Sequence, residues 1–312
     1  MLRGERAFGV LILLGLVSSL VLGGVLAVLV PRAVVLATHG AGGPRDVVSI
    51  LLIGLAALGI TLGLSSLLRQ LFATLRLIHR LLARRVETPE RVDIAAGGLD
   101  LAGRIDVVDD ERPFSFCYWF LRPRICLSTA LVGRLGRDEL RAVLLHERYH
   151  LVHRDPLRLV IARYLAAGLY VVPMVEDLVE HFTLEKELEA DGHAVSRIGV
   201  APLARALYEL LPDADSVSLG LLVPVGALSV TEARIDHLVE GRPLEMRVSP
   251  ASVALSFGAL TAAAILAAAQ APAPAQLPPV LAVPGLLVAP ASLLFVAAVS
   301  GGVEQLRLVV HR

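Results

Sequence analysis

The sequence predicts a mainly α-helical membrane protein, with about four transmembrane helices and a cytoplasmic α+β domain inserted between the second and third. Hydrophobic residues make up 55% of the 312 residues, and the mean hydropathy is +0.70. A pair of long apolar runs lies near each end of the chain, and a region of mixed strand and helix patterns lies between them. Ordinary soluble domains are less apolar.

Four apolar segments are long enough to cross the roughly 30 Å hydrocarbon layer of a bilayer. The first has a short basic start, as signal peptides do, but its apolar core is too long and no small-residue cleavage site follows. We therefore expect an uncleaved helix. The predicted spans are residues 8–30, 47–68, 252–269 and 281–300. The predicted organisation is a two-helix membrane segment at 1–69, a cytoplasmic domain at 70–250, and a second two-helix segment with a short tail at 251–312.

The distribution of arginine predicts the orientation of these spans. Five arginines follow the second span between residues 69 and 85 with no acid among them, whereas the loop between the last two spans has no Lys or Arg. Arg32 and Arg45 in the first external loop are a weaker opposing signal. We expect a multi-pass protein of the cytoplasmic membrane with both termini and the 70–250 domain in the cytoplasm. The net charge of zero gives no reason to expect direct nucleic-acid binding.

A further apolar stretch, residues 157–175, lies inside the predicted domain. It contains Arg158 and Arg163, and unpaired charges inside a bilayer are costly. The pattern favours a helix that lies on the membrane surface or packs into the catalytic core over a fifth span, although the sequence leaves its entry into the bilayer open.

A small sheet is expected between residues 91 and 129. Residues 103–108 and 114–120 read as strands, and a break at 122–124 precedes a further strand at 125–128. Cys117 and Cys126 flank this hairpin and could face each other, but the cytoplasmic placement favours reduced thiols. An exposed edge of such a sheet could take a substrate backbone as an added strand; which edge does so stays open.

The residues His146-Glu147-Arg148-Tyr149-His150 form an HExxH pattern. Good helix formers precede it, and Asp155-Pro156 marks the end of the helix and the start of another. Side chains four apart share one face of a helix, so His146 and His150 can bind one metal ion. Glu147 then lies beside the metal, where it can accept a proton from water. This is the arrangement of a zinc hydrolase with one Zn²⁺ and a glutamate base.

A catalytic zinc needs a third protein ligand. Pro156 occupies the position where metzincins place a third histidine, which excludes that class. Glu187 and Asp191 share a face of a second predicted helix, so Glu187 could bind zinc while Asp191 orients a ligand histidine. His193 could reach the cleft and stabilise an oxyanion, although an ordinary surface histidine is the simpler interpretation.

The stretch from Ile105 to Asp191 resembles the BlaR/MecR-type integral-membrane metallopeptidases. The resemblance rests on 114–117, 121–125, 128–129, 138–157 and 187–191, and HtpX-type membrane peptidases share the HExxH and ExxAD patterns. It implies a gluzincin-type zinc peptidase domain, with His146, His150 and Glu187 as zinc ligands, Glu147 as base and Asp191 beside a ligand. The best-known members carry a penicillin-binding sensor after the last span; this chain ends at Arg312, so β-lactam sensing is not expected.

These features predict a membrane-anchored zinc endopeptidase that cleaves a cytosolic or membrane-proximal protein. The resemblance suggests a transcriptional repressor as the substrate in a regulated proteolysis circuit. Two alternatives stay open: an HtpX-type protease for quality control of membrane proteins, and a non-catalytic zinc-binding membrane sensor or scaffold. The sequence does not indicate the cleavage site, the activating signal or the oligomeric state.

Overall fold

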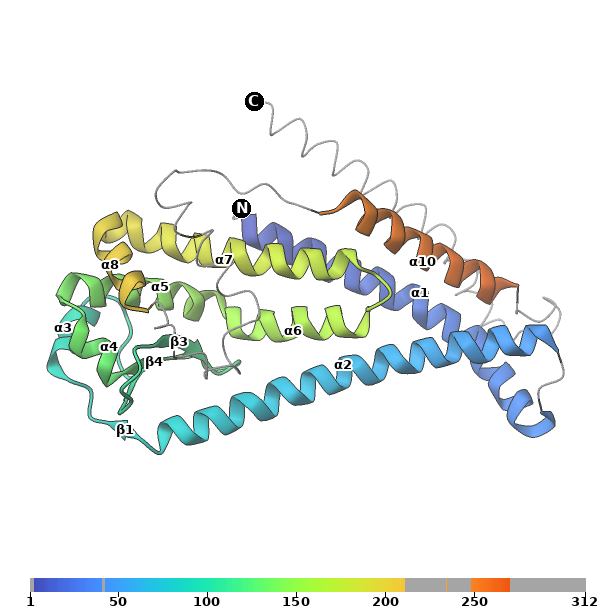
Figure 1. Ribbon diagram of the computed structural model, residues 1–312, viewed down its shortest axis with the longest axis horizontal. Coiled ribbons are helices and arrows are strands. Elements are labelled where there is room, and N and C mark those ends of the chain that lie inside the picture. The colour runs from blue at the N-terminus through green and yellow to red at the C-terminus, as the bar shows by residue number, and fades with distance from the viewer. Residues whose placement is uncertain (1–2, 41–42, 211–233, 235–247, 270–312) are drawn as a thin grey trace, which may run out of the picture. The chain divides into compact units, whose positions relative to one another are not determined.

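The computed structural model describes residues 3–40, 43–210, Arg234 and 248–269. Its secondary structure is mostly helical, with one four-stranded sheet (Figure 1). The contacts divide the described residues into two compact units. The first unit contains residues 3–8, 67–163 and 179–210 with Arg234, and the second contains residues 9–66, 164–178 and 248–269.

Three helices are long and apolar enough to cross a membrane among the described residues. They are α1 (Arg3–His39), α2 (Pro44–Leu82) and α10 (Pro250–Ala268). The structure therefore has helices of spanning length at three of the four predicted spans. α2 extends 14 residues beyond the predicted span, because no proline or glycine interrupts the Arg-containing stretch after Gly63. The predicted span at 281–300 and the tail after it lie outside the described residues.

The apolar stretch at 157–175 is divided between two helices. α6 (Asp155–Gly168) has 14 residues and is too short to span a bilayer, and α7 begins at Met174 after a turn. The end of α6 approaches α2 closely: a Cβ on Gly59 would lie 2.7 Å from the carbonyl oxygen of Gly168. Small residues permit such close helix packing. The part of the stretch after Tyr164 thus packs against a candidate span, a position that the sequence did not favour.

The first unit contains a four-stranded sheet in the order β1-β2-β4-β3. The central pair, β2 and β4, is parallel, and both outer pairs are antiparallel. Three of the strands were predicted from the sequence, although β2 and β3 are shorter than expected. The strand β1 and the helix α3 (Glu90–Ala96) were not predicted. The strands are β1 (Arg85–Val86), β2 (Ile105–Val108), β3 (Ser115–Tyr118) and β4 (Arg124–Ser128).

The two cysteines lie on opposite faces of this sheet. Phe116 of β3 pairs with Cys126 of β4, so these two side chains lie on the same face of the sheet. Successive side chains of a strand point to opposite faces, and Cys117 therefore lies on the other face. Cys117 packs against the main core, whereas Cys126 joins Val108, Phe114 and Tyr118 in a second cluster. The expectation that the thiols could face each other was wrong, and both are free.

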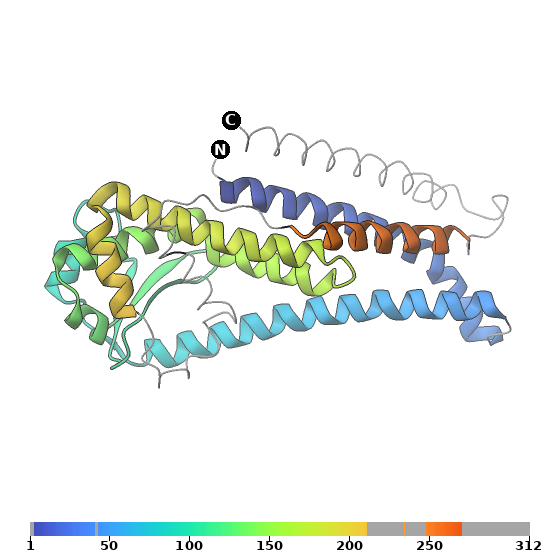
Figure 2. The ribbon, with the colours of Figure 1, turned by 45° about the horizontal axis from the view of Figure 1, so that its top comes forward.

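One face of the sheet and the helices over it form the main core of the first unit (Figure 2). The sheet contributes Val107, Ile125 and Leu127, all fully buried. The helix α5 (Arg137–His153) packs on this face through residues that include Leu140 and Leu144, and α4 (Thr129–Arg134) and α8 (Val200–Leu210) complete the core. Burial of this face fixes α5 in rotation, which determines where the HExxH side chains point.

Candidate metal centre

The HExxH residues lie in the last three turns of α5, as the sequence predicts. The helix begins after Gly136 and has two acidic residues in its first turn, where their negative charge interacts favourably with the helix dipole. It ends at Arg154, whose φ of 53° is in the left-handed region and reverses the chain. α6 therefore starts at Asp155 directly beside the last turn of α5, and the Asp155 carboxylate returns to His150.

α5 and α7 (Met174–Ile198) bring His146, His150 and Glu187 together, the three side chains that the sequence singled out as ligands. The Nε2 atoms of the two imidazoles are 3.2 Å apart, and each lies 3.5 Å from an oxygen of Glu187. Donors placed tetrahedrally around zinc at bonds of 2.0–2.1 Å are about 3.3–3.4 Å apart. The three donors, called the metal cluster below, thus have the spacing that a zinc ion requires.

Each imidazole of the metal cluster is oriented by a carboxylate on its other nitrogen. His146 Nδ1 lies 2.9 Å from Asp191 Oδ1, and His150 Nδ1 lies 2.9 Å from Asp155 Oδ2. A carboxylate on Nδ1 favours the tautomer in which the lone pair of Nε2 faces a metal. Sequence spacing identified Asp191 for this purpose. Asp155 was expected only to mark the start of the next helix, because its contact with His150 depends on the chain reversal at Arg154.

Arg234 is a member of the site that the sequence did not identify. Its Nε and Nη2 each donate to an oxygen of Asp191 at 2.7 Å, and its Nη1 lies 3.1 Å from Glu187 Oε2. Arg234 is the one described residue between positions 211 and 247. Arg234 is 43 residues from Asp191, and no local pattern predicts a contact across that distance.

The electrostatics of the metal cluster favour positive charge among its donors. Burial alone would lower the pKa of His146, but Asp191 and Glu187 outweigh it and raise the pKa to about 10. Burial alone would raise the pKa of Glu187, but Arg234, His150 and His146 hold it well below its usual range. The pKa of Asp191 is also lowered, because contacts with His146 and Arg234 outweigh the effect of burial. A cation between these donors would satisfy the same carboxylates.

Glu147 lies beside the metal cluster, and a residue of the sheet holds its side chain in place. Its side chain is buried, and its Oε1 accepts a hydrogen bond from the Ser115 hydroxyl at 2.8 Å. Ser115 is the first residue of β3, the edge strand that contacts α5. The glutamate is therefore fixed next to the ligand set, with one oxygen bound by Ser115.

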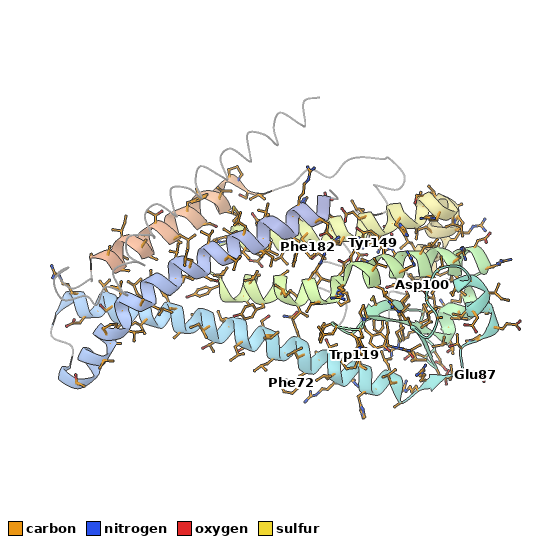
Figure 3. All side chains as sticks on the ribbon, turned by 180° about the vertical axis from the view of Figure 1, so that it is seen from behind. Phe72, Glu87, Asp100, Trp119, Tyr149 and Phe182 are labelled. Atoms are coloured by element: carbon orange, nitrogen blue, oxygen red, sulfur yellow. The ribbon has the colours of Figure 1, made fainter. Side chains whose placement is uncertain are left out.

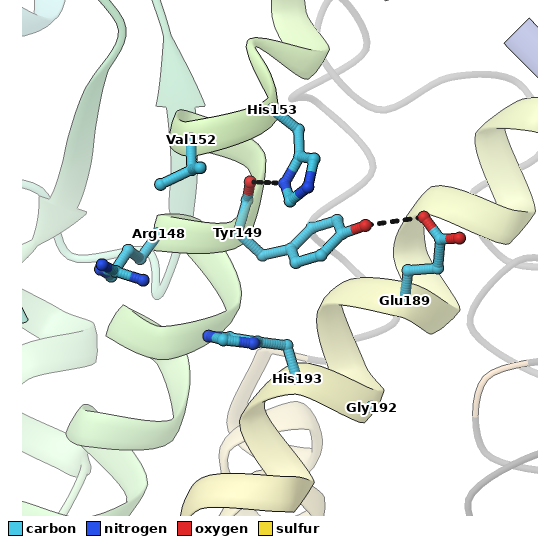
Figure 4. A pocket seen from close by; sticks show the side chains of 7 residues that line it. All are labelled: Arg148, Tyr149, Val152, His153, Glu189, Gly192 and His193. Atoms are coloured by element: carbon cyan, nitrogen blue, oxygen red, sulfur yellow. Dashed lines mark hydrogen bonds between the residues drawn. The ribbon is translucent and has the colours of Figure 1, made fainter. Parts of the chain in front are cut away.

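His193 lies in a different environment from the metal cluster. It borders a cavity of about 470 Å³ on α5 and α7, together with Arg148, Tyr149 and His153 (Figure 4). Burial, with Arg197 and Arg148, lowers the pKa of His193. His153 stacks on Tyr149 with ring centroids 4.0 Å apart. The structure thus brings together Glu147, Asp191 and the three ligands, but places His193 among the residues of this cavity.

Comparison with known protein families gives a match over residues 80–179 to peptidase family M48. The matched segment covers about a third of the chain and contains the sheet, His146, Glu147, His150 and Asp155. Glu187 and Asp191 lie beyond its end, so their assignment rests on the geometry and on the sequence pattern.

Two curated relatives are protease HtpX homologues. The one from Acidiphilium cryptum is 28% identical over 153 residues, which cover 45% of this chain and 52% of the relative. The one from Thermococcus sibiricus is 26% identical over 178 residues, which cover 51% of this chain and 61% of the relative. The chain thus spans between half and two thirds of their length. The matched segment is thus similar to peptidases, and the BlaR/MecR-type likeness stays a prediction.

Proposed function

We propose that this chain is a membrane-anchored zinc endopeptidase. The observation that carries the proposal is the convergence of three donor atoms from α5 and α7 at the spacing of zinc ligands. The similarity to protease HtpX homologues and to family M48 supports it independently. The three apolar helices support the membrane anchor.

The residues of the site divide the chemistry among them. His146, His150 and Glu187 would hold one Zn²⁺ ion, which supplies Lewis acidity and lowers the pKa of water to roughly 7. Glu147, held by Ser115, accepts a proton from the attacking water and returns it to the leaving amine. Asp155 and Asp191 keep the two imidazoles in the ligand orientation.

The free edge of β3 is the place where we expect the substrate backbone to bind. Among the described strands, β3 and β1 are the two edges, and β1 has only two residues. Ser115 connects β3 directly to Glu147. An extended peptide paired with β3 would therefore pass beside the base, and main-chain hydrogen bonds would hold it without regard to sequence.

The similarity to protease HtpX homologues favours the HtpX-type alternative, quality control of membrane proteins, over cleavage of a single repressor. The BlaR/MecR-type resemblance of residues 121–129 keeps regulated cleavage of a repressor as the second candidate. Quantitative proteomics of cells with the intact enzyme and with Glu147→Gln separates the two. Accumulation of many membrane proteins in the variant supports the first, and accumulation of one DNA-binding repressor supports the second.

Substitution of Glu147 by Gln tests the proposed mechanism. We expect the rate of cleavage of a labelled unfolded protein in detergent micelles to fall by about 10²–10⁴-fold, because the general base is lost. Zinc should stay bound, since the three ligands are intact. Asp138→Asn, which changes an exposed carboxylate of the same helix, is the matched control and should retain activity. Retained activity in Glu147→Gln would contradict the role of Glu147 as the base. Zinc binding without hydrolysis by the unaltered chain would instead favour the non-catalytic alternative.

A further inference from the structure

The first turn of α1 docks onto the helices that carry the metal cluster. The backbone N–H of Gly4 donates to Glu189 Oε1 at 2.9 Å, and Glu5 pairs closely with Arg158 of α6. Phe8 packs against Phe182 of α7, with ring centroids 5.2 Å apart. Phe182 is fully buried, and Figure 3 shows it with Tyr149 beside the beginning of α1. This segment belongs to the same compact unit as α5.

Glu5 also reaches Lys186, the one lysine of the sequence. Lys186 is 2% exposed and immediately precedes the ligand Glu187. Its Nζ lies 3.2 Å from Glu5 Oε1, 3.1 Å from Glu189 Oε2 and 3.4 Å from the Tyr149 hydroxyl. A buried ammonium group is stable only when carboxylates compensate its lost hydration. Glu5 is therefore one of the carboxylates that hold the buried Lys186 side chain in this position.

Lys186 connects this cluster to a metal ligand through Asp155. The Nζ of Lys186 is 3.9 Å from Asp155 Oδ1, and the other oxygen of Asp155 lies 2.9 Å from His150 Nδ1. Asp155 is 2% exposed, and its Oδ1 has no hydrogen-bond partner among the described residues. A buried carboxylate needs a nearby cation. Lys186 supplies it and thereby holds Asp155 where it orients the imidazole.

We propose that Glu5 and Lys186 are positioning residues for the metal centre: the first turn of α1 holds Lys186, Lys186 holds Asp155, and Asp155 holds the His150 ring. A segment at the start of a membrane helix thus sets the affinity of the site for zinc. The inference rests on the proposed function in that it takes the metal cluster to be a zinc site. It goes beyond that function in making the docking of α1 a condition for tight metal binding.

Zinc affinity and lysine reactivity of the full chain in detergent micelles test the proposal. Zinc dissociation constants are measured by competition with a chromophoric chelator for the unaltered chain, Glu5→Gln, Lys186→Met and Lys186→Arg. Arg6→Gln changes an exposed side chain of the same helical turn and is the matched control. The rate of acylation of Lys186 by an amine-reactive reagent, followed by peptide mass spectrometry, reports the docking itself.

We expect zinc to bind about 10-fold more weakly in Lys186→Met and about 3- to 10-fold more weakly in Glu5→Gln. These losses lie at or below the roughly 10- to 100-fold loss of metal affinity that follows removal of a group in direct contact with a metal ligand. Lys186→Arg should recover part of the loss, and Arg6→Gln should differ less than twofold from the unaltered chain. Acylation of Lys186 should be at least about 10-fold faster in Glu5→Gln, because undocking of the first turn of α1 exposes the amine to the reagent.

Two results would overturn the inference. One is zinc affinity within twofold of the unaltered chain in both Glu5→Gln and Lys186→Met, and the other is equally fast acylation of Lys186 with and without Glu5. A variant that melts at lower temperature but binds zinc normally also counts against a positioning role. An unaltered chain that binds no zinc would instead refute the proposed function, and the positioning role would fall with it.

Discussion

Two buried clusters of charged side chains among the described residues of the first unit can be compared, and one of them has the geometry of a binding site. In the sheet cluster, Asp106 of β2 binds Arg124 through both oxygens, at 2.5 and 2.8 Å, and also contacts Arg85 and the Tyr118 hydroxyl. In the metal cluster, three donor atoms point at one another across 3.2–3.5 Å. Burial and shifted pKa values are common to both, so neither property identifies the functional site.

The difference lies in where the positive charge is. Arg124 and Arg85 place two guanidinium groups on one carboxylate, so the sheet cluster is electrically complete within the chain. In the metal cluster, Arg234 contacts the carboxylates of Glu187 and Asp191, whereas the Nε2 atoms of the two imidazoles and the carboxylate of Glu187 converge on one another. Convergence of potential ligand atoms, rather than buried charge as such, indicates a site for a cation.

The largest expected effect is the loss of a ligand from the metal cluster. Glu187→Ala should weaken zinc binding at least about 1000-fold, or roughly 4 kcal/mol, because two imidazoles alone do not complete a catalytic zinc site. Chelator competition measures this affinity. Glu180→Ala, an exposed position on the same helix, should bind zinc normally. Tight binding in Glu187→Ala would mean that another donor completes the site.

The reciprocal change in the sheet cluster should affect stability and leave zinc binding unchanged. Asp106→Asn leaves Arg124 and Arg85 without their buried carboxylate, and breaking a buried ion pair costs about 3–5 kcal/mol. Chemical denaturation in detergent micelles measures the free energy of unfolding. The zinc affinity of the folded variant should stay within about twofold of the unaltered chain, and a larger loss would show that the clusters are coupled.

Loss of the carboxylate that orients His146 should have a smaller effect on zinc than loss of a ligand. Asp191→Asn keeps the size of the side chain but removes the charge that fixes the Nδ1 proton. Zinc affinity should fall by about 10- to 100-fold, again measured by chelator competition. An affinity equal to that of the unaltered chain would remove Asp191 from the site.

The smallest expected effect is the pH dependence of the sheet cluster. Burial raises the pKa of Asp106, but Arg124 and Tyr118 outweigh it, and the folded pKa lies below the ordinary value of 3.8. A lowered pKa means that the stabilisation is fully present above pH 3.8 and is lost as the pH falls through the folded pKa. The stability difference between the unaltered chain and Asp106→Asn should therefore be constant from pH 7 to 5 and shrink below 3.8. A difference that shrinks already between pH 7 and 5 would contradict this assignment.

The sequence predicted those parts of the molecule that depend on local spacing. The HExxH pair, the Glu187–Asp191 pair and the apolar helices are set by helical periodicity or by length, so they can be recognised without coordinates. Asp155, Ser115 and Arg234 could not be assigned, because their contacts depend on the reversal at Arg154, on the placement of β3 beside α5, and on a segment 43 residues from Asp191. The division of residues 157–175 depends likewise on helix packing against Gly59 and Gly63.

The metal content and ligand shell of the purified full chain test the central claim most directly. Elemental analysis and X-ray absorption after purification with zinc should find one zinc per chain, bound by two imidazole nitrogens and a carboxylate oxygen at about 2.0–2.2 Å. Glu147→Gln should show the same shell. A chain that retains no zinc, or a shell that contains sulfur from Cys117 or Cys126, would contradict the account.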